Sequence, residues 1–433
     1  MTRWMSQELR ERALHWRLLH RSRRRVVVPA LFLILLVALL SSVRVAAGSP
    51  DSGGDTPGLP SCGRQATTGS TVSPWRMGAL QFFSPTTGVG VTASAVICFR
   101  HSKEGSEVSF RSQPVRLALT ADGGRFWRLT GAAAPTGPTM PGPAGGQLVA
   151  ASTRRIWAIV GRDRLVATTD GGRSWKQATI GGPAVALMRS GGFVWAVTCP
   201  SVASRDSPLA CRPHLWRAPQ STGVWTEVKL PELTAQALES VDVTISSGHT
   251  ILLTVMTAGK TATGEMAVST DGGTTWRTHL DPRWDGHACT FGSELATAPP
   301  QTFWLLCDGN GAAGSSPKGL LRTTDAGATW HTVSAVTSLI HTPPAGSIPL
   351  AEPSALAAGS SNRLWLSVTN GLAETDDGGK TWTNVPTVFN VGGWSTTLSV
   401  LNATHAWLLA PGAGLWSTTD GEHWEPIGPL HTH

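Results

Sequence analysis

The 433-residue sequence predicts an all-β protein: a single β-propeller of about seven four-stranded blades, preceded by one N-terminal transmembrane helix. Three observations predict this fold. A short motif ending in tryptophan recurs at a spacing near fifty residues, short apolar stretches precede each copy, and one long apolar run follows an arginine cluster near the N-terminus. A repeat of about fifty residues is typical of a small sheet that buries its faces only against copies of itself.

The recurring motif has the approximate form Thr-Thr-Asp-Gly-Gly-x-x-Trp. Six copies contain both key residues: Asp122 with Trp127, Asp170 with Trp175, Asp271 with Trp276, Asp325 with Trp330, Asp377 with Trp382, and Asp420 with Trp424. A degenerate copy without the aspartate ends at Trp225 and fills the gap after Trp175. The seven tryptophans are successively 48, 50, 51, 54, 52 and 42 residues apart. This rhythm predicts seven blades, while Trp75 leaves open whether it closes the ring or marks an eighth, incomplete blade.

Four strands are expected in each unit. In the first unit they are Ala79–Phe83, Gly88–Thr92, Val115–Thr120 and Trp127–Leu129. Later units repeat the second strand with a central aromatic residue, as in Ile156-Trp157-Ala158. Apolar residues on both faces suit a blade that lies between two neighbours.

The aspartate motif is expected to be the turn between the third and fourth strands. Its aspartate accepts backbone N–H bonds, its glycines supply the positive φ of a tight reversal, and its tryptophan adds a large apolar contact. We therefore interpret the six aspartates as structural rather than catalytic.

This octet resembles the Asp-box, or BNR, repeat of sialidases, sortilin-type receptors, some endoglucanases and the photosystem assembly-factor family. The wider unit, from Ala79 to Trp127, is most similar to the assembly-factor and general BNR-like propellers. The resemblance covers about residues 75–430. It implies a propeller with the box at the blade periphery and ligands near the central axis, but it implies no single function.

The charge is concentrated at the N-terminus. The formal net charge is +7, yet residues 1–25 hold eight arginines and two glutamates, which leaves about +1 for the rest. Nucleic acid is therefore not an expected partner. Residues 26–43 are uncharged and long enough to cross a bilayer, with arginines on the flank that stays cytoplasmic. A cleaved signal peptide ending near Gly48 is the alternative.

These features predict four segments: a basic cytoplasmic tail at 1–25, a transmembrane signal-anchor at 26–43, a flexible linker at 44–74 and the propeller at 75–433. The body would then lie outside the cytoplasmic membrane. Six cysteines fit an oxidising location. The expected disulfides join Cys199 to Cys211, Cys289 to Cys307, and Cys62 to Cys98; the alternative is six reduced thiols.

The sequence excludes one enzyme class. It contains no tyrosine, so the tyrosine-dependent mechanism of sialidases is impossible. Another glycosidase needs two carboxyl groups about 5–10 Å apart, but the remaining acids form no recurrent pair: Asp163, Glu232, Glu239, Asp242, Glu265, Asp281, Asp285, Asp308 and Glu352. Asp285 with His287 is a weak metal or acid–base candidate. No catalytic residue, cofactor or metal site is predicted.

The expected function is a non-catalytic scaffold that binds a protein, peptide or glycan partner outside the membrane. Three long inserts are the candidate contact segments: Gly131–Gly146, Pro200–Arg212 and Val336–Pro353. The alternative is a carbohydrate-active hydrolase of the Asp-box propeller class.

Overall fold

A computed structural model describes most of the expected propeller. The described residues are 71–72, 77–93, 95–102, 105–112, 114–135, 147–160, 164–199, 213–232, 238–246, 249–257, 264–280, 283–284, 287–288, 292–298, 300–309, 315–337, 343–389, 396–410 and 414–428. All belong to one compact unit, residues 59–433. The predicted tail, anchor and most of the linker lie outside them. No helix long and apolar enough for a membrane span occurs in this described part.

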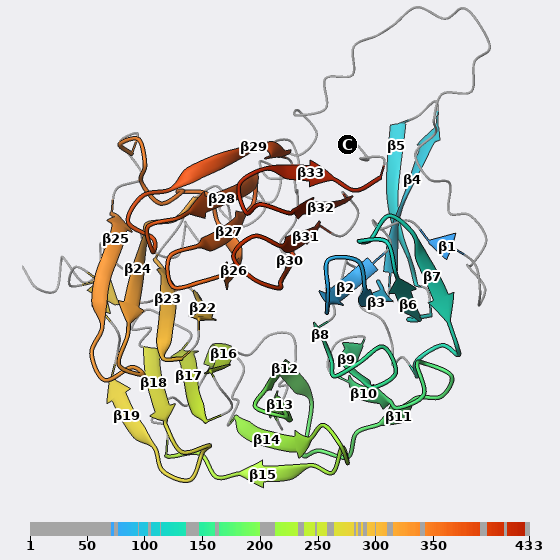
Figure 1. Ribbon diagram of the computed structural model, residues 1–433, viewed down its shortest axis with the longest axis horizontal. Coiled ribbons are helices and arrows are strands. Elements are labelled where there is room, and N and C mark those ends of the chain that lie inside the picture. The colour runs from blue at the N-terminus through green and yellow to red at the C-terminus, as the bar shows by residue number, and fades with distance from the viewer. Residues whose placement is uncertain are drawn as a thin grey trace, which may run out of the picture. The chain divides into compact units, whose positions relative to one another are not determined.

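Seven antiparallel sheets follow one another along the chain (Figure 1). Each is a blade whose four strands run in sequence from the centre outward. Blade 1 contains β2 (Met77–Phe82), β3 (Gly88–Thr92), β6 (Leu117–Thr120) and β7 (Trp127–Thr130); blade 2, β8 (Gln147–Ala150), β9 (Ile156–Val160), β10 (Arg164–Thr168) and β11 (Lys176–Gln177); blade 3, β12 (Ala184–Ser190), β13 (Phe193–Thr198), β14 (His214–Pro219) and β15 (Thr226–Val228); blade 4, β16 (Leu238–Ser246), β17 (Thr250–Thr257), β18 (Gly264–Ser269) and β19 (Arg277–Leu280); blade 5, β22 (Gly292–Ala298), β23 (Thr302–Asp308), β24 (Lys318–Thr323) and β25 (His331–Val336); blade 6, β26 (Pro353–Ala358), β27 (Leu364–Val368), β28 (Gly371–Thr375) and β29 (Thr383–Phe389); blade 7, β30 (Thr397–Val400), β31 (Ala406–Ala410), β32 (Gly414–Thr418) and β33 (Trp424–Pro426).

The seven blades close into a ring. The first strand of each blade contacts the first strand of the next, and β30 of blade 7 contacts β2 of blade 1. Among the described strands none is exchanged at this junction, because the four strands of blade 7 are consecutive in the chain. Side chains close it instead: the rings of Phe82 and Trp407 stack at 3.8 Å between centroids, and the Phe82 N–H donates to Ser399 Oγ at 3.0 Å.

The hydrophobic core lies between blades rather than within them. One cluster joins Trp195 and Leu215 of blade 3 to Ile251 and Leu253 of blade 4, and similar clusters fill the other junctions. The second-strand tryptophans are almost fully buried: Trp157, Trp195, Trp304, Trp365 and Trp407. Burying one indole stabilises the fold by roughly 4–6 kcal/mol before the entropic cost of ordering it. A single blade therefore cannot fold without its neighbours.

The seven-blade count confirms the tryptophan rhythm, and no eighth blade occurs among the described residues. Three additions were not predicted. A short strand β1 (Thr71–Val72) pairs with β7 as a fifth strand of blade 1, a hairpin of β4 (Ala95–Ser102) and β5 (Gly105–Ser112) is inserted between β3 and β6, and β20 (Arg283–Trp284) pairs with β21 (His287–Ala288) before blade 5. Trp75 lies outside the described residues.

Two of the six cysteines are seen in disulfides. Cys199 and Cys307 are both disulfide-bonded and almost fully buried. Cys62, Cys211 and Cys289 lie outside the described residues, and for Cys98 only its place on β4 is described. The three pairings therefore stay predictions.

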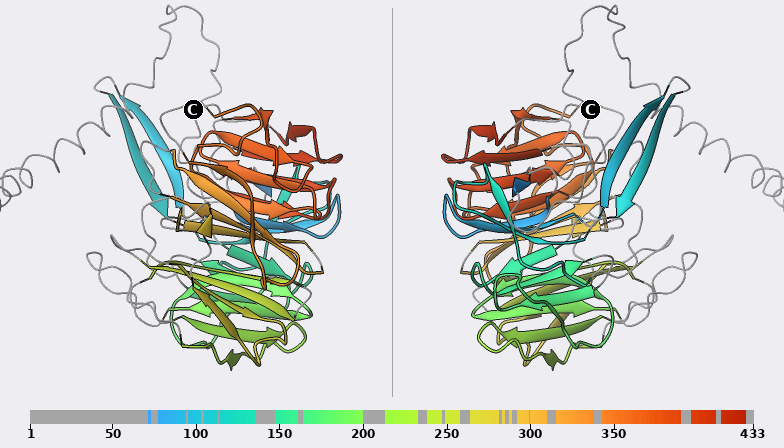
Figure 2. Two further views of the ribbon diagram at one scale, coloured as in Figure 1. Left: turned by 90° about the vertical axis from the view of Figure 1, so that its left-hand side faces the viewer. Right: turned by 90° about the vertical axis from the view of Figure 1, so that its right-hand side faces the viewer.

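The ring has two unlike faces. The turns after first and third strands meet at one face, where for example the Gly123 N–H donates to Thr86 O and the Gly378 N–H to Asn362 O. We call this the turn face. Segments after second and fourth strands meet at the opposite face, as when the Ala134 N–H donates to Val115 O and the Ser316 N–H to Leu350 O. We call this the loop face; in Figure 2 the β4–β5 hairpin, which follows a second strand, extends from it.

Candidate functional site

The six aspartate turns use their own side chains to hold the chain reversal. In blade 1 the Thr120 hydroxyl donates to Asp122 Oδ1 at 2.8 Å and accepts the Gly124 N–H at 3.0 Å. Asp122 Oδ1 also accepts the Phe126 N–H at 3.1 Å. Gly123 and Gly124 have φ of 79° and 100°, which side-chain-bearing residues rarely adopt. The same contacts recur in blades 2, 4, 5 and 6, and in shortened form in blade 7.

Equivalent hydrogen bonds keep the carboxylates of Asp170 and Asp271 ionised. The hydroxyl and N–H of Ser174 lower the pKa of Asp170 to about 2, and those of Thr275 lower the pKa of Asp271 to about 2. A catalytic acid needs a pKa near the working pH, so these aspartates are unsuited to proton transfer.

The turns also join neighbouring blades through their backbone carbonyl groups. Among the described residues, a donor of one blade bonds to a turn carbonyl oxygen of the next blade at six junctions. These pairs are Thr130 Oγ1 to Gly171 O, Arg155 to Ser221 O, Arg217 to Gly272 O, Trp304 Nε1 to Gly378 O, Arg363 to Gly421 O and Trp407 Nε1 to Gly123 O, at 2.7–3.3 Å. The polar groups of the turns are thus largely used inside the protein.

Blade 3 makes its turn without an aspartate. The Gly223 N–H donates to Pro219 O at 2.8 Å, and Gly223 has a φ of 69°. Arg155 of blade 2 still donates to the carbonyl groups of Gln220 and Ser221. The link between blades therefore survives where the carboxylate is missing.

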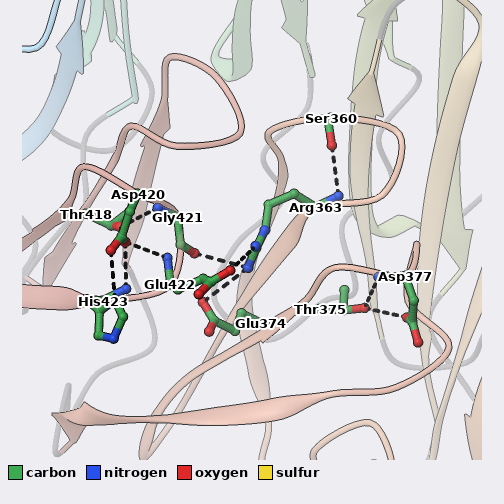
Figure 3. Close-up of polar contacts among 10 residues, drawn as sticks. All are labelled: Ser360, Arg363, Glu374, Thr375, Asp377, Thr418, Asp420, Gly421, Glu422 and His423. Atoms are coloured by element: carbon green, nitrogen blue, oxygen red, sulfur yellow. Dashed lines mark hydrogen bonds and ion pairs between the residues drawn. The ribbon is translucent and has the colours of Figure 1, made fainter.

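One carboxyl group near the turn face does not accept hydrogen bonds from a turn as the aspartates do. Glu374 of β28 lies beside Arg363, whose guanidinium is 4.0 Å from Glu374 Oε2 and 3.2 Å from Glu422 Oε1 (Figure 3). Burial raises the pKa of Glu374 to about 7, against the opposing effect of Arg363. The indole N–H groups of Trp365 and Trp424 interact with this carboxyl group but form no hydrogen bond of good geometry. Sequence reasoning missed this residue.

The loop face holds a second cluster, between blades 5 and 6. Asp308 ends β23, its ladder partner Lys318 begins β24, and Glu352 directly precedes β26. Lys318 is fully buried, and its Nζ donates to the carbonyl oxygens of Ser316, Leu350 and Ala351 at 3.0, 2.8 and 3.0 Å. Nζ also lies 4.0 Å from Asp308 Oδ1, which accepts a bond from the Ser316 hydroxyl.

Burial dominates the electrostatics of this cluster. It raises the pKa of Asp308, against a hydrogen bond from Ser316 and the charge of Lys318. It lowers the pKa of Lys318 to about 8. Burial and the nearby Asp308 charge raise the pKa of Glu352. The structure therefore brings together two carboxyl groups that the sequence showed only as scattered acids.

For the other acids considered in the sequence analysis, the structure gives at most a place in the fold. Glu265 is buried on β18, Glu232 is exposed after β15, and Glu239 and Asp242 lie on β16. Asp163, Asp281 and Asp285 lie outside the described residues, so the pairing of Asp285 with His287 stays a prediction. Within the described part, no group of three or more histidine, cysteine or acidic residues is arranged to hold a metal ion.

Comparisons with known proteins concern the fold. No protein-family model and no curated protein matches the chain. Among solved structures, YCF48 from Cyanidioschyzon merolae is 14% identical with a TM-score of 0.42, covering 65% of this chain and 85% of that one. YCF48 bound to D1 peptide is 13% identical with a TM-score of 0.46, covering 86% and 100%.

An ancestral GH74 enzyme is 13% identical with a TM-score of 0.51. The match covers 81% of this chain but only 48% of the enzyme, so the chain spans about half its length. The protein therefore has a seven-bladed β-propeller fold, and its similarity to the GH74 enzyme is one of fold alone. At these identities the likeness says nothing about ligand or activity.

Proposed function

We propose that the protein is a non-catalytic binding scaffold, anchored in the membrane by residues 26–43, whose extracytoplasmic propeller binds a protein, peptide or glycan through its loop face. The observation that carries this proposal is the difference between the two faces. The turn face consists of short turns whose N–H and carbonyl groups bond inside the ring. The loop face receives the long connections and the inserted hairpin.

All three contact segments expected from the sequence lie, in chain order, between strand ends at the loop face. Gly131–Gly146 and Val336–Pro353 connect fourth strands to the next blade, and Pro200–Arg212 follows a second strand. The β4–β5 hairpin also follows a second strand. Recognition commonly resides on loops that a rigid frame holds in place, and the interlocked blades are such a frame.

The six aspartates have a structural role in this proposal. Each carboxylate accepts backbone N–H groups of its own turn, as Asp271 does from Thr274 and Thr275 at 3.0 and 2.9 Å. Their side chains therefore fix the turn rather than face a ligand.

Crosslinking in the native membrane tests the binding face. A photoreactive residue is placed on the loop face at Pro344 or Ala345, both exposed, and on the turn face at Phe126, which is 68% exposed. The loop-face probes should capture a defined partner identified by mass spectrometry, and the turn-face probe should not. Capture of the same partner from Phe126 alone would contradict the proposal.

The anchor is tested separately. The full chain should remain in membranes after carbonate extraction, whereas a variant lacking residues 26–43 should be released. A protease added to intact cells should digest the propeller side of the chain and spare residues 1–25. Carbonate release of the full chain would refute the anchor and leave the binding face to be judged by crosslinking.

A hydrolase is the second candidate, and the Asp308–Glu352 cluster favours it. Two carboxyl groups with raised pKa values on the loop face suit a general acid and its partner. Against this, Lys318 Nζ donates to three carbonyl oxygens and the Ser316 hydroxyl donates to Asp308. These bonds join two loops, so the cluster also has a structural explanation. A glycan hydrolysis screen of wild type, Asp308→Asn and Glu352→Gln decides: turnover that disappears in both variants establishes the hydrolase.

A further inference from the structure

The propeller has a small net charge, but it contains two regions of opposite charge, which we call the two poles. Residues 114–182, in blades 1 and 2, carry nine Lys or Arg and three Asp or Glu, a balance of +6. Residues 343–428, in blades 6 and 7, carry two Lys or Arg and seven Asp or Glu, a balance of −5. The ring closes between blades 7 and 1, so the poles are neighbours. A basic region therefore exists that whole-chain charge does not reveal.

The exposed cations of blades 1 and 2 gather at the turn face. Arg125 and Arg173 lie in the aspartate turns, and Arg154 lies in the turn between β8 and β9. Arg128 and Lys176 lie at the beginning of the outer strands β7 and β11, next to those turns. All five side chains are exposed, and none forms an ion pair with another described residue. We call these five residues the basic rim.

The turns place these residues on two blades that are firmly joined. The Ala132 N–H donates to Gly172 O at 2.7 Å, and the Thr130 hydroxyl donates to Gly171 O at 3.0 Å. The turn of blade 2 is thereby fixed against the outer strand of blade 1. The backbone that carries the basic rim is therefore held across the junction between blades 1 and 2 rather than on two independent loops.

The polypeptide that leads to the proposed anchor joins the propeller beside this rim. Strand β1 pairs with β7 in the register Thr71 to Arg128 and Val72 to Trp127. Because the pairing is antiparallel, β1 runs along the outer edge of blade 1 toward the turn face, with Thr71 on its loop-face side. The described chain thus begins on a blade that carries part of the rim, and charge rather than the direction of the chain is the argument for docking.

We propose that the basic rim docks on anionic lipid headgroups of the membrane that holds the anchor, with the loop face directed away from the bilayer toward its partner. This inference rests on the proposed anchor. Each basic residue near an anionic membrane strengthens partitioning about fivefold, so five together contribute roughly three thousandfold. Self-association between opposite poles is the weaker reading, because exposed ion pairs contribute little.

The test uses the full chain, with a specific protease site inserted between Ser52 and Gly53. The protein is reconstituted in vesicles of phosphatidylcholine alone or with 30% phosphatidylglycerol, cleaved, and sedimented in about 50 mM salt. The released propeller should pellet with the phosphatidylglycerol vesicles and leave them in about 500 mM salt. It should remain in the supernatant with phosphatidylcholine.

Two variants of equal charge change identify the surface. Arg128→Gln, Arg173→Gln and Lys176→Gln together should weaken retention about a hundredfold. The control combines Lys229→Gln, Arg277→Gln and Lys380→Gln, which remove exposed cations from blades 3, 4 and 6, and it should retain binding. Circular dichroism of both variants reports whether they are folded.

Each other outcome is decisive. Release from both kinds of vesicle, equal retention on both, or equal loss in both variants overturns docking through the rim. If the propeller pellets without vesicles, or forms a salt-sensitive dimer in size-exclusion chromatography, the two charged poles serve self-association. Either result overturns docking through the rim. If carbonate extracts the uncleaved chain from the vesicles, the anchor is refuted. Docking of the rim is judged separately, by whether the cleaved propeller stays on phosphatidylglycerol vesicles in a salt-sensitive way.

Discussion

At two neighbouring blade junctions, the residue paired with the buried tryptophan carries opposite charge. Between blades 5 and 6, Arg322 is the ladder partner of Trp304 and lies 5.4 Å from its ring centroid, while the indole donates to Gly378 O. Between blades 6 and 7 the equivalent pair is Glu374 with Trp365. Here the Trp365 indole N–H interacts with Glu374 without a hydrogen bond of good geometry, and Arg363 donates to Gly421 O in the turn of the next blade.

The difference shows what the position beside the tryptophan requires. An arginine there is attracted to the ring face, and Arg217 occupies the same position beside Trp195 in blade 3 at 5.8 Å. A glutamate gains no such attraction, and burial raises its pKa to about 7. The turns are alike, but the junction between blades 6 and 7 carries a buried acid that the junction between blades 5 and 6 does not.

The largest expected effect is loss of a junction indole. Trp304→Ala removes a fully buried side chain and its bond to Gly378, so the free energy of unfolding should fall by about 3–5 kcal/mol. Urea unfolding followed by tryptophan fluorescence measures this. Phe126→Ala, at an exposed aromatic residue, is the control and should change stability by less than about 0.5 kcal/mol.

The acid at the other junction should make stability depend on pH. Since folding raises the pKa of Glu374 from 4.5 to about 7, the folded state binds a proton more tightly than the unfolded state. This stabilising contribution is complete below pH 4.5 and is lost as the pH rises through 7, amounting to about 3 kcal/mol. The difference in unfolding free energy between wild type and Glu374→Gln should follow this curve.

The amide variant should therefore be the more stable protein at pH 8 and lose this advantage at pH 4. Glu422→Gln, at the exposed partner of the same arginine, is the matched control and should shift stability little at either pH. A difference between wild type and Glu374→Gln that is independent of pH would show that this carboxyl group does not titrate in the window.

The smallest effect separates the two indole N–H groups. Trp304→Phe loses a buried hydrogen bond to Gly378, whereas Trp365→Phe loses an N–H that has no such partner. Both remove similar apolar area, so Trp304→Phe should cost about 1 kcal/mol more. Equal costs in urea unfolding would mean that the bond to Gly378 contributes nothing net.

The propeller could be predicted because its signal is repeated. Each aspartate turn is local in sequence, and seven tryptophans at nearly equal spacing average out the errors of any one unit. The β4–β5 hairpin occurs once and interrupts the period without a marker of its own, so it was missed. Strand β1 was missed because two residues, Thr71 and Val72, carry no periodic pattern.

The clusters could not be predicted because their members are distant in sequence. Asp308 and Glu352 belong to different blades, and they meet only because one blade packs on the next. Glu374 follows the pattern of its strand, and nothing local shows that its carboxyl group would be buried against Trp365 and Trp424. The basic rim could not be predicted for a related reason. The net charge of the propeller is a sum in which the positive and negative poles cancel.

The closure of the ring has a consequence for how the chain matures. Phe82 lies in the first blade, and its stacking partner Trp407 is synthesised more than three hundred residues later. Until then one side of blade 1 has no neighbour to cover it, while each following blade can pack as soon as it is made. The nascent propeller is therefore an open arc with an uncovered apolar blade face at each end, and the synthesis of blade 7, residues 397–426, allows it to close.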